Sequence, residues 1–127
     1  MVGIVVVSHS AELARGVAEL AGQMAGPDVR IEVAGGGPGG ILGTDDALVR
    51  DAIRRANQGD GVIILGDLGS AILTIRHVLE RNGNGYARLV DAPLVEGAVA
   101  AAVMASAGCS LGDVAIAAEE ARGANKL

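Results

Sequence analysis

The chain has 127 residues, the size of a single domain. Half of the residues are apolar, yet there is no Phe, no Trp and a single Tyr, Tyr86, and the only lysine is Lys126. Aromatic cages and base-stacking platforms need rings, and a phosphate-binding P-loop or a Schiff base needs a lysine, so these kinds of site are excluded. The net charge of −5 argues against nucleic acid as a partner.

Cysteine usage and the apolar runs indicate the compartment. The single cysteine, Cys109, forms no disulfide framework and no Cys/His metal pattern, and we expect it to be a small packing residue rather than a nucleophile. The apolar run at residues 2–7 has no basic segment before it and is too short for a signal peptide. Residues 98–108 are too few to span a membrane. We therefore expect a cytoplasmic protein with no membrane partner and no bound metal.

Short apolar runs alternate along the chain with helical stripes. Continuous β-branched runs are typical of strands buried on both faces, and apolar residues spaced by three and four are typical of helices. The predicted elements are strand 4–7, helix 13–24, strand 29–34, helix 48–56, strand 62–65, helix 72–79, strand 87–90, and helices 95–107 and 111–122. This order predicts one α/β domain over residues 1–127, with a mainly parallel four-stranded sheet and helices on both faces.

Polar residues mark the starts of several predicted helices. Ser10 is a good N-cap for the first helix, Thr44 or Asp45 for the second, and Ser110 for the last, where Asp113 follows at the spacing of a capping box. The glycine-rich segment 35–40 is predicted to be a loop that covers the site or meets a partner. A second glycine-rich segment, 82–85, is predicted to be a turn.

The predicted helix at residues 95–107 is almost uniformly small and apolar. A helix that is apolar all round must be covered on more than one side. In a domain of this size a second copy of the chain is a natural cover, so we expect a homodimer.

His9 is the strongest candidate for chemistry. Ligands of open parallel sheets bind beyond the carboxyl ends of the strands, and His9 follows the first strand between two hydroxyls, Ser8 and Ser10. A helix N-terminus favours anions and a neutral imidazole, which suits a histidine that accepts a phosphoryl group. Asp67, after the third strand, is the best carboxylate to fix the tautomer of His9. The alternative is that His9 is only a helix-start residue.

Other motifs carry weaker signals. Glycines within residues 35–40 match the dinucleotide pattern GxGxxG, but the segment follows the second strand and no helix begins directly after it. A serine hydrolase is disfavoured because no GxSxG elbow exists. His77 is expected to be a surface or partly packed residue, and Asp91 and Glu96 are expected to cap or be solvated rather than act as acid–base groups.

Four blocks of the sequence together resemble a known family. Residues 7–10 (VSHS), 43–45 (GTD), 67–71 (DLGSA) and 92–97 (APLVEG) look like the phosphoryl-carrier subunit of phosphoenolpyruvate-dependent dihydroxyacetone kinases, which has the mannose-type IIA fold of the bacterial phosphotransferase system. The resemblance extends over nearly the whole chain. It implies a mannose-type IIA fold and a homodimer.

The resemblance also implies a relay. The histidine-containing phosphocarrier protein hands a phosphoryl group to His9, which passes it to ADP bound on the nucleotide-binding subunit of the kinase. Asp67 matches the carboxylate that hydrogen-bonds the histidine. Residues expected to line the site are Ser8, Ser10, Thr44, Gly69 and Ser70. No cofactor is expected on this chain, because ADP, ATP and Mg²⁺ belong to the partner subunit.

Two alternatives stay open at this point. The first is a sugar-specific IIA domain that phosphorylates a IIB partner on the same fold. The second is a regulatory domain of the same fold that transfers no phosphoryl group.

Overall fold

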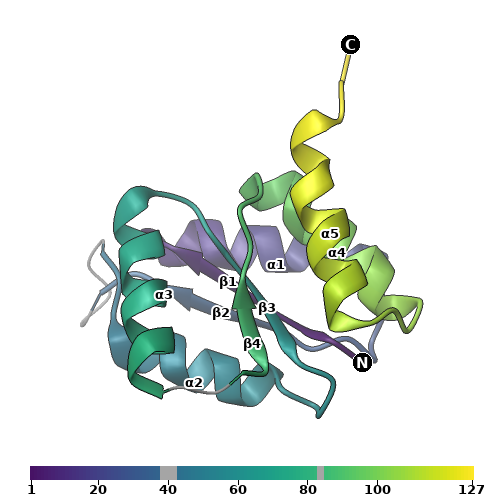
Figure 1. Cartoon of the computed structure of the whole chain (residues 1–127). Helices are drawn as coiled ribbons and strands as arrows, with labels where there is room; N and C mark the ends of the chain where they lie inside the picture. The colour runs from purple at the N-terminus through teal and green to yellow at the C-terminus, as the bar shows by residue number, and fades with distance from the viewer. Residues whose placement is uncertain (38–42, 83–84) are drawn as a thin grey trace.

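The computed structural model describes residues 1–37, 43–82 and 85–127. Its helices and strands alternate along the chain as the hydrophobic pattern predicts (Figure 1). They are β1 (Gly3–Ser8), α1 (Ala11–Ala25), β2 (Ile31–Gly35), α2 (Asp46–Ala56), β3 (Val62–Gly66), α3 (Gly69–Asn82), β4 (Ala87–Leu89), α4 (Leu94–Ser106), α5 (Leu111–Glu120) and the short 3-10 helix η2 (Ala121–Gly123).

Within these residues four strands form one sheet in the order β2-β1-β3-β4. Every neighbouring pair is parallel, so the predicted fold class is confirmed. The central strands β1 and β3 are buried along their whole length, which explains why they show continuous apolar runs. Their register pairs Val5 with Ile64 and Val7 with Gly66, so the residues that follow the two strands emerge side by side.

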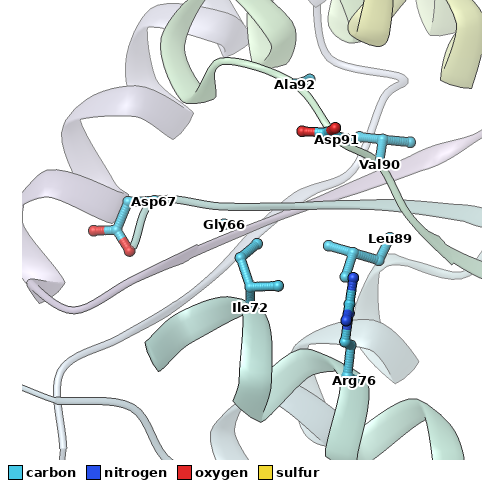
Figure 2. Close-up of a pocket in the computed structure, with 8 residues that line it drawn as sticks. All are labelled: Gly66, Asp67, Ile72, Arg76, Leu89, Val90, Asp91 and Ala92. Carbon is cyan, nitrogen blue, oxygen red and sulfur yellow. The ribbon is translucent and has the colours of Figure 1, made fainter. Parts of the chain in front are cut away.

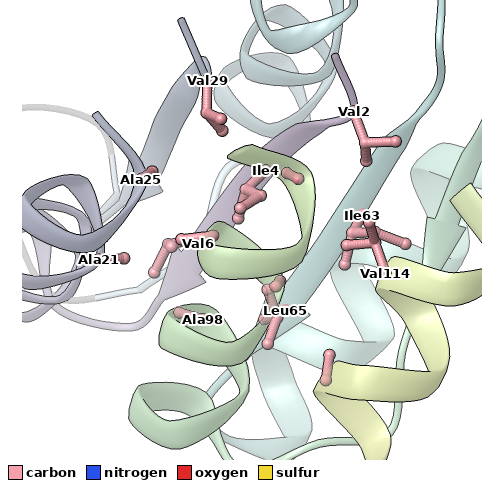
Figure 3. Close-up of a cluster of buried hydrophobic side chains, with 14 of the residues drawn as sticks. Val2, Ile4, Val6, Ala21, Ala25, Val29, Ile63, Leu65, Ala98 and Val114 are labelled. Carbon is pink, nitrogen blue, oxygen red and sulfur yellow. The ribbon is translucent and has the colours of Figure 1, made fainter. Parts of the chain in front are cut away.

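Helices cover both faces of the sheet (Figure 1). Alternate side chains of β1 point to opposite faces. Ile4 and Val6 pack in one core cluster with α1, α4 and α5, part of which Figure 3 shows. Val5 and Val7 pack in the other cluster with α2 and α3. Because helices cover both faces, the ends of the strands rather than the faces of the sheet are open to ligands.

The structure changes the predicted bounds of β2 and α3. β2 begins at Ile31 and includes Gly35, so the assignment of Gly35 to a loop is wrong. A Cβ at this position would lie 2.7 Å from Cα of Ala11, and glycine therefore lets the start of α1 pack against the strand end. α3 continues through Asn82, where a turn was predicted. The segment predicted to cover the site or meet a partner, 35–40, includes residues 38–40, which lie outside the described residues. Residues 83–84 of the predicted turn also lie outside them.

The apolar helix α4 is covered mostly within the chain. It packs on α1, on α5 and on the two central strands, and its buried positions are small residues such as Ala98, Ala101 and Ala105. Val95 and Val103 remain 37% and 46% exposed. Most of the apolar surface of α4 therefore needs no second copy, and the homodimer stays a prediction.

The predicted helix caps are confirmed. The side chain of Ser10 accepts a hydrogen bond from the Leu13 N–H, Asp45 rather than Thr44 caps α2, and Ser110 accepts from the Asp113 N–H. Among the described residues, the helices are all too short or too polar to cross a bilayer.

The packing of β1 against α2 makes a stability prediction. A Cβ on Gly3 would lie 2.0 Å from the carbonyl oxygen of Ala56, so we expect Gly3→Ala to destabilise the fold by about 1–3 kcal/mol through overpacking. The contrasting variant is Gly16→Ala in α1. A Cβ at Gly16 would meet open space, so this substitution should stabilise the fold by about 0.5–1 kcal/mol. Urea denaturation of both variants measures these changes. Equal unfolding midpoints for Gly3→Ala and the wild type would contradict the first.

Candidate functional site

The candidate site lies at the carboxyl ends of the neighbouring strands β1 and β3, where the chain turns to opposite faces of the sheet. After β1 the chain turns to α1 on one face, and after β3 it turns to α3 on the other. Neighbouring connections that diverge in this way open a crevice at the carboxyl ends of the strands, the place where doubly wound sheets bind ligands. Residues 8–10 and 67–70 border this crevice.

The Asp67 carboxylate joins the two sides of the crevice. It accepts a hydrogen bond from the Ser8 hydroxyl at 2.7 Å and from the backbone N–H of His9 at 3.1 Å. It also accepts from the N–H of Leu68 at 2.7 Å. Hydrogen bonds to an ionised acceptor are stronger than those between neutral groups, so this carboxylate fixes the loop after β3 against the loop after β1.

Ser8 is the buried polar centre of this arrangement. It is fully buried, and its hydroxyl donates to Asp67 while accepting from the backbone N–H of Ser10 at 3.0 Å. A buried hydroxyl is tolerated only when it is hydrogen-bonded. Ser8 therefore acts on the backbone of the site, and its side chain is not open to a ligand.

The imidazole of His9 has one buried ring nitrogen without a hydrogen-bond partner in the described structure. His9 is partly exposed, and its Nδ1 atom is buried without a hydrogen-bond partner in the part of the chain that the structure describes. The contact that the structure gives between Asp67 and His9 is therefore to the backbone N–H and not to the ring. The role of Asp67 in fixing the tautomer stays a prediction.

The N-terminus of α1 forms one wall beside His9. Ser10 caps this helix by accepting from the Leu13 N–H at 3.3 Å. The partial positive charge of a helix N-terminus favours an anion in this place. His9 immediately precedes the cap, so an anionic group carried on its ring would lie near the positive end of α1.

Residues 43 and 44, shortly before α2, are hydrogen-bonded to His9 and to α3. The N–H of Gly43 donates to the carbonyl oxygen of His9 at 2.9 Å. The hydroxyls of Thr44 and Thr74 are 2.7 Å apart, and Thr74 donates to the carbonyl oxygen of Ser70 at 3.0 Å. Thr44 is thus tied to α3 and lies next to the segment that contacts His9.

The structure brings most of the predicted site residues to one edge of the sheet. Ser8, His9, Ser10 and Asp67 form one hydrogen-bonded group. Gly69 and Ser70 are exposed at the start of α3. Sequence reasoning missed Thr74, although it stands one helical turn after Ser70.

A hollow of about 390 Å³ lies beside this group, at the ends of β3 and β4. Figure 2 shows the residues that line it, which are Gly66, Asp67, Ile72, Arg76, Leu89, Val90, Asp91 and Ala92. Arg76 was not recognised as a site residue from the sequence, because an arginine on a helix is usually solvated. Within the described residues no group of three or more His, Cys, Asp or Glu side chains fits a metal ion.

Comparison with known proteins gives a consistent group of relatives. The family model EIIA-man, described as "PTS system fructose IIA component", matches residues 3–115. The chain is 42% identical over 120 residues to the "PEP-dependent dihydroxyacetone kinase, phosphoryl donor subunit DhaM" of Escherichia coli (strain K12), a match that covers 90% of this chain and 25% of that protein. It is 39% identical over 106 residues to the phosphoryl donor subunit DhaM of "PEP-dependent dihydroxyacetone kinase 2" of Listeria innocua, covering 81% of this chain and 85% of that protein.

The relatives differ in length. The chain spans about a quarter of the length of the first curated relatives that it matches. A solved structure of similar size, the crystal structure of a protein of unknown function, superposes with a TM-score of 0.80 at 34% identity and covers 93% of this chain and 92% of that chain.

The buried hydroxyl of Ser8 makes a second stability prediction. Ser8→Ala removes a donor to Asp67 and the acceptor of the Ser10 N–H, so we expect a loss of about 1–3 kcal/mol, the penalty for buried groups left unpaired. Ser70→Ala, at an exposed position two residues into α3, should change stability by less than about 0.5 kcal/mol. Chemical denaturation compares the two variants. A Ser8→Ala protein as stable as Ser70→Ala would show that the buried hydroxyl does not hold the loops.

Proposed function

The chain belongs to the EIIA-man family and, within it, to the DhaM type of phosphoryl donor subunits, and from this premise we propose that it carries a phosphoryl group on His9. The relatives are named phosphoryl donor subunits of PEP-dependent dihydroxyacetone kinases. The single observation that carries the proposal is the position of His9, in the crevice between β1 and β3, directly before the N-terminus of α1.

The environment of the ring indicates which nitrogen reacts. Nδ1 is buried while the residue as a whole is partly exposed, so Nε2 is the atom that an incoming donor reaches. In the proposed transfer, the Nε2 lone pair forms the new N–P bond as the N–P bond on the donor histidine breaks. The proton stays on Nδ1, and the ring takes on positive charge while the donor ring becomes neutral.

This charge gives Asp67 its proposed role. A ring that reacts at Nε2 carries its proton on the buried Nδ1, where a hydrogen bond to a carboxylate stabilises the charged form. Asp67 already contacts the backbone of His9, and it is the acceptor that we assign to Nδ1–H during transfer. Ser8 and the Leu68 N–H hold the other bonds of this carboxylate, so it is positioned before the phosphoryl group arrives.

The partners follow from the same premise. We propose that the histidine-containing phosphocarrier protein loads His9, and that His9 passes the phosphoryl group to ADP on the nucleotide-binding subunit of a dihydroxyacetone kinase. The only lysine of the sequence, Lys126, is paired with Glu96. We assign the nucleotide and its Mg²⁺ to the partner subunit, where cations surround the phosphates during transfer.

Labelling tests the proposal directly. Incubation with labelled phosphoenolpyruvate, enzyme I and the phosphocarrier protein should label the wild-type chain to about one phosphoryl group per chain, with acid lability typical of an N–P bond. His9→Ala should take up no label, whereas His77→Ala, at a half-exposed histidine paired with Asp46, should label like the wild type. Equal labelling of His9→Ala and the wild type, or no labelling of either, would falsify the carrier role.

The acceptor is identified in a second step. Labelled chain mixed with the ADP-loaded nucleotide-binding subunit should yield labelled ATP. In a parallel reaction the labelled chain is mixed with a sugar-specific IIB domain. If the label stays on His9 with the nucleotide-binding subunit but is transferred to the IIB domain, the dihydroxyacetone assignment is wrong and the sugar-specific alternative replaces it.

The assignment of Asp67 makes a separate prediction. Asp67→Asn keeps an acceptor for the N–H groups of His9 and Leu68 but loses the charge that stabilises the protonated ring, so we expect the transfer rate to fall by about 100-fold or more. Rapid-quench measurement of His9 labelling gives the rate, and circular dichroism checks that the variant is folded. A rate within twofold of the wild type would contradict this role.

A further inference from the structure

Among the described residues that line the hollow beside the site, Arg76 is the one cationic side chain. Ile72 and Arg76 come from α3, and Leu89, Val90 and Asp91 come from the end of β4. Figure 2 shows Arg76 reaching up from α3 toward Leu89, with Ile72 between it and Asp67. The hollow therefore combines apolar walls with a guanidinium at one end.

The two carboxylates that line the hollow already have partners. Asp67 accepts hydrogen bonds from the Ser8 hydroxyl and from two backbone N–H groups. Asp91 forms an ion pair with Arg122 at 3.3 Å, and Arg122 also donates to its backbone carbonyl. In the part of the chain that the structure describes, no ion pair neutralises Arg76, whose side chain is exposed. Asp67 keeps its negative charge, since its donors are neutral, and Arg76 is the charged lining side chain left without a partner among the described residues.

Two leucines that follow lining residues directly in the sequence are also exposed. Leu68 is 58% exposed at the loop after β3, and Leu73 is 68% exposed on the first turns of α3. Residues four apart lie on one face of a helix. Ile72 and Arg76 therefore share one side of α3, and Leu68, which directly precedes the helix, continues the same spacing. We call Leu68, Ile72 and Arg76 the α3 stripe. It passes from apolar residues beside Asp67 to a cation farther from His9.

We propose that the α3 stripe is a docking site for a protein partner that presents an acidic side chain next to an apolar one, with the carboxylate entering the hollow to meet Arg76. The proposal rests on the proposed function, because a partner must approach His9 for transfer to occur. Arg76 then acts in docking and partner choice, and it takes no part in the bond-making step.

The observations favour a side chain over a free anion such as phosphate. Two carboxylates border the hollow and would repel a dianion more strongly than a single carboxylate. The apolar walls from Ile72 and Leu89 suit the methylene groups of a glutamate side chain, which free phosphate lacks. The exposed leucines likewise match a protein surface, since exposed apolar patches mark interaction sites.

Charge reversal at Arg76 tests the proposal. The matched control is Arg54→Glu, because Arg54 is exposed in the last turn of α2, at the opposite edge of the sheet, and gives the same change of charge. Transfer rates are measured against concentration for two reactions: loading of His9 by the phosphorylated phosphocarrier protein, and discharge to the ADP-loaded nucleotide-binding subunit. We expect Arg76→Glu to raise KM about tenfold for at least one partner with kcat changed less than twofold, as for a charge that acts in encounter rather than chemistry.

The outcomes separate this inference from the proposed function. If the wild type never labels at His9, the proposed function fails and the docking proposal fails with it. If the wild type labels and Arg76→Glu matches Arg54→Glu in both KM values, or loses kcat alone, only the docking proposal is overturned. Inhibition of wild-type transfer by 10 mM inorganic phosphate that disappears in Arg76→Glu would show that the hollow takes a free anion, and would overturn the assignment to a protein side chain.

Discussion

The hydrogen bonds that the Asp67 carboxylate accepts across the boundary between β1 and β3 are the constraint on which the site depends. Beyond the ends of these strands the chain turns toward opposite faces of the sheet, so the ladder of backbone hydrogen bonds no longer joins the two segments. One ionised acceptor with two donors from the β1 side, the Ser8 hydroxyl and the His9 N–H, replaces it. The backbone of His9 is held at the mouth of the crevice for this reason, while its ring is left without a hydrogen bond at Nδ1 in the described structure.

Small side chains make this arrangement compact. α4 packs on α1, α5 and the central strands through buried alanines, and Gly35 allows the start of α1 to lie against the end of β2. Close packing of this kind brings helix starts up to the strand ends. The absence of Phe and Trp from the sequence is consistent with such an interior, since large rings would separate the layers. The abundance of Ala and Gly therefore reflects contacts inside the chain, and it gives only indirect support to the homodimer expected from α4.

Parallel topology also explains why acidic side chains gather at the edge of the sheet where the site lies. Each helix that follows a strand begins at the same edge of the sheet, and acidic residues favour helix starts, as Glu12, Asp46 and Glu96 do here. An edge of this kind suits partners that bring cations, whether on their own surface or with a bound nucleotide. Arg76 is a local exception, and its place on α3, beyond the apolar residues next to Asp67, gives the edge two distinct regions. Two regions of different charge suit the proposed role of a carrier that meets two partners in turn.

Sequence reasoning predicted the parts of this protein that depend on neighbours along the chain. The order of strands and helices, the caps at Ser10 and Ser110, and the position of His9 between a buried strand and a helix all follow from local pattern, because burial on one or both faces leaves a period in the sequence. The closeness of Asp67 to His9 also follows from the sequence, since parallel strands end at one edge, whereas the hydrogen bond between Asp67 and the ring of His9 stays a prediction.

Other features depended on contacts between segments far apart in the sequence. The sequence did not show that Asp67 contacts the backbone of His9 and the hydroxyl of Ser8, that Thr44 meets Thr74, or that Arg76 borders a hollow at the end of β4. The hydrogen bonds among these contacts join residues 30 to 59 positions apart, and no local period encodes any of the contacts. By itself the sequence determined which elements form and which histidine stands at a strand end. Only the tertiary structure decided which donors and charges surround that histidine, because side-chain contacts arise when the sheet and its helices pack together.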